Sequence, residues 1–193
     1  MRQEIEIEFK NMLTEEEFDA LLKALPFPKH SIIQKNHYFE TKNFSLKNNG
    51  AALRIREKNG VFVLTLKEPH PQGLLETHEK LTAEEAQHWL GGKPVLKPHI
   101  TKRLETLDVP IKDFQYYGCL TTERWETTYK EALLVLDRSE YNGITDYELE
   151  LEVKDRNTGI LLFDELLREY NIEKKPSPNK IVRYFKSLPA GGK

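Results

Sequence analysis

The sequence predicts an α+β fold in which a largely antiparallel β-sheet closes into a barrel with helices packed outside it. Most of the predicted strands follow one another as hairpins, which join antiparallel strands. Most of them also alternate apolar with charged residues, so that one face is apolar and the other charged. Several amphipathic helices are available to cover the apolar face. The charged faces of a closed sheet would then point inward.

The composition favours a single domain spanning residues 1–193, because this length suits one sizeable core and no linker or repeat interrupts it. A net charge of -2 gives no basic field, so no nucleic-acid partner is expected. The one cysteine, Cys119, excludes an internal disulfide and a cysteine-based zinc site. No apolar run approaches the roughly 20 residues of a membrane span. The chain begins with a charged strand, so we expect no signal peptide and a cytoplasmic location.

The first strand, residues 2–10, sets the pattern for the others. Its apolar residues alternate with charged ones, which are Glu4, Glu6, Glu8 and Lys10. Two neighbouring carboxylates followed by a lysine suit a divalent cation and the anion that it carries. The alternative is an ordinary amphipathic strand whose charges meet water.

The remaining elements follow from caps, turns and periodicity. We expect helices at residues 14–25, 82–90, 99–107 and 158–170, and a last helix that Ser177-Pro178 caps and that runs through Leu188. We expect strands at residues 31–41, 51–58, 61–68, 74–81, 131–140 and 145–154, with a hairpin turn at Asn59-Gly60. Residues 114–129 are expected to form a pair of strands interrupted near Gly118.

The inward faces of such a barrel would carry many charges of both signs. The acids are Glu6, Glu8, Glu76, Asp137, Glu148, Glu150 and Glu152, and the bases are Lys10, Arg54, Arg56, Lys67 and Arg124. Burying these groups unpaired would cost far more free energy than a fold can supply, so the interior would hold water, metal or a ligand. The alternative is an open sheet whose charged face meets solvent.

Several motifs, taken in order, resemble those of the CYTH superfamily, the triphosphate tunnel metalloenzymes. They are Glu6-x-Glu8-x-Lys10, Tyr38-Phe39-Glu40, Leu53-Arg54-Ile55-Arg56, Thr65-Leu66-Lys67, Leu136-Asp137-Arg138 and residues 147–152, Tyr-Glu-Leu-Glu-Leu-Glu. The chain length and the late Asn179-Lys180-x-x-Arg183 resemble the YjbK-like bacterial branch. The chain departs from the pattern at Glu40, where the family usually has Asp, and at His78, where it often has a second Glu.

The resemblance implies an eight-stranded antiparallel tunnel that binds a triphosphate-containing small molecule and hydrolyses it with Mg²⁺ or Mn²⁺. The implied metal ligands are Glu6, Glu8, Asp137, Glu150 and Glu152. The implied phosphate-binding residues are Lys10, Arg54, Arg56, Lys67, Arg124, Lys180 and Arg183, the last two closing over one end. Lys10, Arg124 and Glu148 are the expected catalytic residues, with Glu148 facing a basic partner or the attacking water. His78 is left outside the predicted ligand set.

The expected reaction is in-line attack of a metal-activated water on a terminal phosphorus. Two alternatives stay open at this point: a sensor that binds a triphosphate or nucleotide without turnover, and an adenylate cyclase. The protein is expected to be a monomer or a homodimer.

Overall fold

The computed structural model describes residues 2–188. Its strands are β1 (Arg2–Leu13), β2 (Ile32–Thr41), β3 (Ala52–Lys58), β4 (Val61–His70), β5 (Gly73–Leu81), β6 (Phe114–Tyr129), β7 (Ala132–Tyr141) and β8 (Ile144–Val153). Its helices are α1 (Glu15–Ala24), α2 (Ser45–Asn48), α3 (Ala83–Leu90), α4 (Pro98–Thr106), α5 (Arg156–Glu169) and α6 (Lys180–Lys186), with a short 3₁₀ turn, η1 (Ile111–Asp113).

The sheet topology confirms the predicted α+β class with an eight-stranded antiparallel barrel. Hydrogen bonding joins the strands in the closed order β1-β5-β4-β3-β2-β6-β7-β8. The chain divides into two compact units, which are described separately. The first unit contains the chain up to Glu6 and residues 34–120, and the second contains residues 7–33 and the chain from Thr121 onward.

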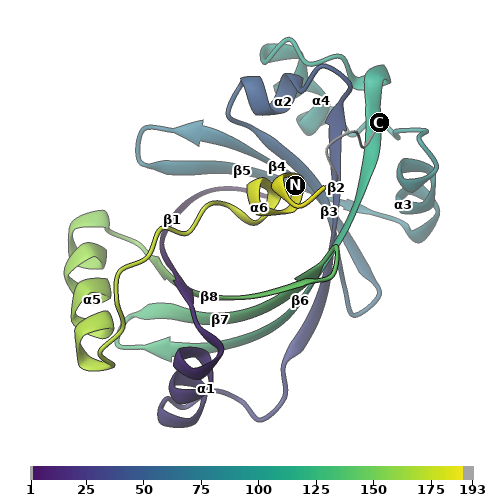
Figure 1. Cartoon of the computed structure of the whole chain (residues 1–193). Coiled ribbons are helices and arrows are strands. Elements are labelled where there is room, and N and C mark those ends of the chain that lie inside the picture. The colour runs from purple at the N-terminus through teal and green to yellow at the C-terminus, as the bar shows by residue number, and fades with distance from the viewer. Residues whose placement is uncertain (1, 189–193) are drawn as a thin grey trace. The chain divides into compact units, whose positions relative to one another are not determined.

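In the first unit, β3, β4 and β5 form an antiparallel meander with helices on its apolar face (Figure 1). The hairpin between β3 and β4 turns at Asn59 and Gly60, whose φ angles of 51° and 72° suit a two-residue hairpin turn. On the apolar face of these strands, Leu53, Leu64 and Leu66 pack with Trp89 of α3 and other apolar residues of the helices. This packing removes the apolar face from water and leaves the charged face on the opposite side of the same strands.

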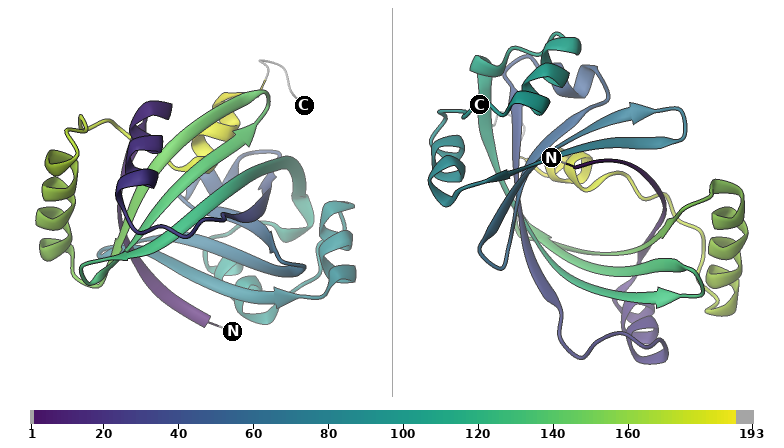
Figure 2. Two further views of the ribbon diagram at one scale, coloured as in Figure 1. Left: turned by 90° about the horizontal axis from the view of Figure 1, so that it is seen from below. Right: turned by 180° about the vertical axis from the view of Figure 1, so that it is seen from behind.

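In the second unit, β7 and β8 form a long hairpin that pairs with the second half of β1 (Figure 2). Helices α1 and α5 supply apolar side chains to one core with these strands, among them Leu21 of α1 and Phe163 of α5. Thr14 begins α1 with the predicted capping box, in which its side chain and that of Glu17 bond reciprocally to the backbone. The two units therefore share one design, in which apolar strand faces are covered by helices.

Two sequence expectations need correction, and one short helix was not predicted. Residues 114–129 form the single strand β6, because Gly118, with φ 130°, continues the strand where an interruption was predicted. Ser177 does not cap the last helix; α6 begins after Asn179, and the Ser177 hydroxyl donates to the Glu148 carboxylate. The short helix α2 has no strong signal in the sequence and was not predicted.

Within the described part of the chain, no helix combines the length and the apolar character that crossing a membrane requires.

Candidate functional site

In the first unit, charged side chains of β1, β4 and β5 form a connected group. The Lys67 ammonium contacts a carboxylate oxygen of Glu6 at 2.6 Å and also pairs with Glu76, which lies directly opposite it on β5. Glu76 is only 4% exposed. Burial alone would raise the pKa of Glu76, but the positive charges of Lys67 and Arg54 outweigh burial and lower this pKa far below its ordinary value. Glu76 is therefore ionised at any physiological pH.

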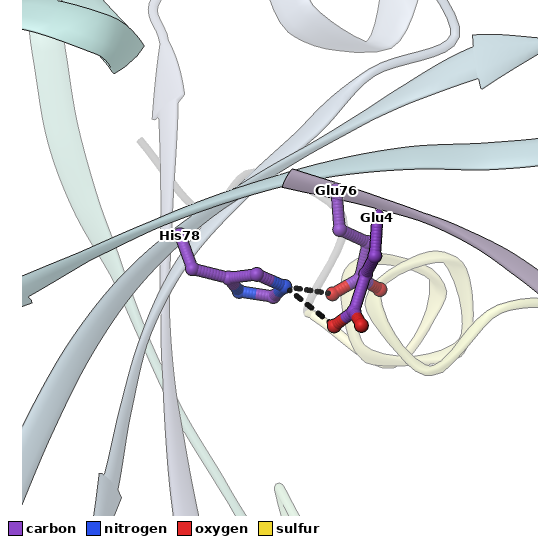
Figure 3. Close-up of side chains that lie close together, drawn as sticks. All are labelled: Glu4, Glu76 and His78. Atoms are coloured by element: carbon purple, nitrogen blue, oxygen red, sulfur yellow. Dashed lines mark hydrogen bonds and ion pairs between the residues drawn. The ribbon is translucent and has the colours of Figure 1, made fainter. Parts of the chain in front are cut away.

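His78 lies next to this group on the same face of β5 (Figure 3). Its Nε2 is 3.1 Å from an oxygen of Glu4 and 3.2 Å from an oxygen of Glu76. Its Nδ1 is 3.0 Å from the hydroxyl of Thr65 on β4. Burial lowers the pKa of His78, and the nearby carboxylates oppose this shift only in part.

The two arginines predicted to bind phosphate lie on β3 in the first unit. Arg56 donates from Nε to the side-chain oxygen of Asn36 at 3.2 Å. The Nε of Arg54 is buried and makes no hydrogen bond to the residues that the structure describes. A buried, charged donor without an acceptor is costly, so this atom marks a position where an anion would be stabilised.

In the second unit, Arg124 of β6 is held between two acids. It donates two hydrogen bonds to Asp137 of β7, at 2.7 and 2.6 Å, and one to Glu150 of β8 at 2.7 Å. All three side chains are less than a tenth exposed. The two-pronged contact with Asp137 matches the fork geometry of a guanidinium with a carboxylate. Burial would lower the pKa of Arg124, but Asp137 and Glu150 raise it well above its usual range.

Helix α6 adds two more cations to the same acids. The Lys180 ammonium contacts Asp137 at 2.8 Å and Glu150 at 2.6 Å, and it also pairs with Glu148. Arg183 donates to Glu148 at 2.9 Å and to Asp146 at 2.8 Å. Burial would lower the pKa of Lys180, but the surrounding carboxylates raise it well above its usual range. Lys180 therefore lies at the point where three buried carboxylates converge.

The remaining predicted residues of the second unit lie along β1 and β8. Lys10 contacts Glu8 at 2.9 Å and donates to the side-chain oxygen of Asn179 at 2.6 Å. It lies opposite Glu150 in the strand register, and Glu8 lies opposite Glu152. Glu6 and Glu8, which were predicted to share an ion, each have a lysine partner, Lys67 in the first unit and Lys10 in the second.

Among residues 2–188, two groups of side chains have the donor atoms of a metal site. Oxygens of Asp137, Glu148 and Glu150 lie within 4.8 Å of one another, and so do ligand atoms of Glu4, Glu76 and His78. The first group contains only carboxylates, which suit hard ions such as Mg²⁺, although Lys180 already supplies a positive charge there. The residue-based prediction did not include Glu4 or Glu76 among the metal ligands, and it considered His78 but set it aside. The sequence could have indicated Glu4 as a ligand, since it lies on the same strand face as Glu6 and Glu8.

The sequence matches the family model described as CYTH domain over residues 4–185. The chain is 45% identical over 186 residues to the candidate triphosphatase YjbK of Bacillus subtilis (strain 168), and the match covers 96% of each protein. A candidate adenylate cyclase from Bacillus halodurans, known from a crystal structure, has a sequence 41% identical to this chain. The two structures superimpose with a TM-score of 0.92, and the match covers 96% of this chain and 100% of that one. A candidate adenylyl cyclase from Hippeastrum, described as having a dominant triphosphatase activity, is 26% identical with a TM-score of 0.80, over 96% of this chain and 98% of that one.

Proposed function

Because this chain belongs to the CYTH family, we propose that it is a metal-dependent triphosphatase that hydrolyses inorganic tripolyphosphate or an organic triphosphate. The YjbK relative and the Hippeastrum relative both carry a triphosphatase description, and each match covers nearly all of this chain. We further propose that residues 1–193 act as one such domain. The protein is expected to work in the cytoplasm as a monomer or a homodimer, without a nucleic-acid partner.

The observation that carries this proposal is the buried Nε of Arg54, which makes no hydrogen bond to the described residues. Arg54 lies on the same strand face as Arg56 and opposite Thr65 of neighbouring β4, two residues before Lys67 on that strand. A phosphate oxygen at Arg54 would accept the missing hydrogen bond, and it would do so as a charge-assisted bond. This support comes from the geometry of the first unit alone and is independent of the names of the relatives.

In the proposed reaction, the basic side chains bind and orient the phosphate chain. The proposed phosphate-binding residues are Arg54, Arg56 and Lys67 in the first unit, and Lys10, Arg124, Lys180 and Arg183 in the second. Arginines suit two-pronged contacts with phosphate oxygens, whereas lysines act as point charges. Positioning and neutralisation of charge are the main demands that phosphoryl transfer makes on a protein.

The proposed metal ligands are carboxylates, which are the ligands that Mg²⁺ and Mn²⁺ prefer. They are Glu6, Glu8, Asp137, Glu150 and Glu152, and all lie on β1, β7 or β8. A bound divalent ion supplies neutralisation of phosphate charge and a lower pKa for a water molecule. Glu148 is proposed to orient the attacking water and to accept its proton. Lys180 and Arg183 both contact Glu148, so they would have to move before it could serve as a base.

One activity panel separates the candidate reactions. The untagged protein is incubated with tripolyphosphate, ATP or thiamine triphosphate, each with Mg²⁺ or Mn²⁺. We expect free phosphate as the product. Pyrophosphate together with cyclic AMP would instead identify the adenylate cyclase for which the Bacillus halodurans structure is named. Binding without any product would identify a sensor.

The metal requirement can be tested separately from the choice of substrate. We expect a chelator to abolish phosphate release and added Mg²⁺ or Mn²⁺ to restore it, because the carboxylates cannot neutralise a triphosphate without a cation. Phosphate release that continues at the same rate in excess chelator would contradict the metal role of Glu6 and Glu8.

The role of Arg54 gives a further prediction. Changing Arg54→Gln should weaken the binding of tripolyphosphate roughly 10- to 150-fold, the effect of losing one charge-assisted hydrogen bond of about 1.5–3 kcal/mol. Isothermal titration calorimetry measures this, with Lys35→Gln, an exposed cation on β2, as the control. The melting temperature should fall only slightly, because the buried Nε has no bond to lose and Glu76, which the Arg54 charge also stabilises, keeps its direct partner Lys67. An unchanged affinity with a large loss of stability would make Arg54 a structural residue.

A further inference from the structure

The first unit contains a group of three neighbouring side chains, Glu4, Glu76 and His78, whose possible ligand atoms lie close together (Figure 3). Glu4 on β1 lies directly opposite Glu76 on β5, and His78 is two residues further along β5, so all three side chains share one face. One oxygen of each carboxylate approaches the same atom, Nε2 of His78, at 3.1 and 3.2 Å. Two carboxylates and one imidazole nitrogen thus converge on a common point.

Each of the three side chains also makes a hydrogen bond or ion pair with a residue outside the group. The second oxygen of Glu4 pairs with Arg2, and the second oxygen of Glu76 pairs with Lys67. The Nδ1 of His78 is 3.0 Å from the hydroxyl of Thr65, a residue that is only 2% exposed. Outer contacts of this kind fix the orientation of metal-binding carboxylates and the ring of a metal-binding histidine. The arrangement is therefore more than a cluster of acids, because Glu76 and His78 are each oriented by an outer contact with Lys67 or Thr65.

We propose that Glu4, Glu76 and His78 bind a divalent transition-metal ion such as Mn²⁺ through two carboxylate oxygens and the Nε2 of the imidazole. Mn²⁺ accepts an imidazole nitrogen beside its carboxylate ligands, whereas Mg²⁺ takes oxygen ligands almost exclusively. Three protein ligands leave coordination positions open for water or a phosphate oxygen. The catalytic role of this site rests on the proposed triphosphatase function. Binding of the metal itself requires no turnover and can be measured without it.

The ligand set makes His78 the residue that discriminates between metals. An all-carboxylate site would bind Mg²⁺ and Mn²⁺ through the same oxygens, whereas Nε2 adds a ligand that favours the transition metal. Lys67 and Arg54 lie near Glu76 and lower its pKa, so this carboxylate remains charged and available as a ligand. The rival explanation is a protonated imidazole that bridges the two carboxylates without any metal.

Pulsed electron paramagnetic resonance of Mn²⁺ tests the proposal, because it detects coupling between the ion and a coordinated nitrogen. Untagged protein is stripped with chelator and given less than one equivalent of Mn²⁺. We expect a nitrogen coupling in the native protein, its loss in His78→Gln, and its retention in His88→Gln, an exposed histidine of α3. The titration is continued to saturation, because the proposed all-carboxylate site also binds Mn²⁺. The absence of nitrogen coupling at every ratio of Mn²⁺ to protein, or a coupling that survives His78→Gln, would overturn the site.

Affinity measurements give a second test that does not depend on activity. Mn²⁺ should bind more tightly than Mg²⁺ in equilibrium dialysis, and Thr65→Val should lower Mn²⁺ affinity roughly 10- to 100-fold, as expected for the loss of an outer contact. A melting curve checks that this nearly isosteric variant is folded. If Thr65→Val binds Mn²⁺ like the native protein, the histidine is not held for a metal.

The experiments can refute the metal-site proposal and the triphosphatase proposal separately. Nitrogen coupling in a protein that releases no phosphate from any triphosphate would refute the triphosphatase proposal and support the metal site. Phosphate release by a protein whose Mn²⁺ shows no nitrogen coupling would refute the site alone.

Discussion

Changing Arg124→Met should lower the free energy of unfolding by roughly 3–5 kcal/mol, the usual effect of removing one partner from a buried ion pair. Arg124 is the shared partner of Asp137 and Glu150, and both acids are almost fully buried. Methionine fills similar space but leaves these two negative charges without their guanidinium. For a chain of this length the melting temperature should fall by roughly 6 to 20 °C.

The matched control for this change is Arg138→Met. Arg138 lies on neighbouring β7, and its side chain is 36% exposed beside Glu123 and Glu140. Exposed pairs of this kind contribute about 0–1 kcal/mol, so the control should melt close to the native temperature. The double change Arg124→Met with Asp137→Asn should recover part of the loss, because it also removes one of the two buried acids that Arg124 paired, while Lys180 keeps Glu148 and Glu150 as partners. Equal melting temperatures for Arg124→Met and Arg138→Met would contradict the structural importance of the Arg124 contacts.

Much of the fold could be predicted because its signals are local. Thr14 with Glu17 predicts the start of α1, and Asn59-Gly60 predicts the hairpin between β3 and β4, since in each case the residues that determine the structure are neighbours in the chain. The alternation along β1 likewise assigned each side chain to its apolar or charged face. The interruption predicted near Gly118 was wrong because glycine permits a turn without requiring one.

The partners of the charged side chains could not be predicted in the same way. A strand's alternation tells which face Glu148 occupies, but its contacts with Lys180 and Arg183 depend on how the segment after α5 returns to β8. The same holds for His78, because its contacts with both carboxylates depend on the register that places Glu4 opposite Glu76. Long-range register decides which charges meet, and a single strand carries no information about its neighbour's register.

Helix α6 provides the positive charge that the acids of β7 and β8 require in this structure. Asp137, Glu148 and Glu150 are buried, and Lys180 contacts all three. A divalent cation at the same point would meet the same oxygens, whose ligand atoms lie within 4.8 Å of one another. The ammonium and a metal ion would therefore compete for one position, because like charges cannot share it at low cost.

Changing Lys180→Met should make the stability of the protein depend on divalent metal. Without the ammonium, Arg124 and Arg183 are the cations that remain in direct contact with the three carboxylates, so the variant should lose roughly 3–5 kcal/mol in chelator. Millimolar Mg²⁺ or Mn²⁺ should restore much of this loss, because an ion that binds only the folded state stabilises it by mass action.

The measurement is the melting temperature of three proteins, each in chelator and in Mg²⁺. Lys186→Met, an exposed lysine on the same helix, is the control and should behave like the native protein in both conditions. We expect the metal-induced rise to be several times larger for Lys180→Met than for the native protein, whose ammonium opposes the incoming ion. If Lys180→Met melts at the native temperature in chelator and metal shifts all three proteins equally, Lys180 neither balances these carboxylates nor competes with a cation for them.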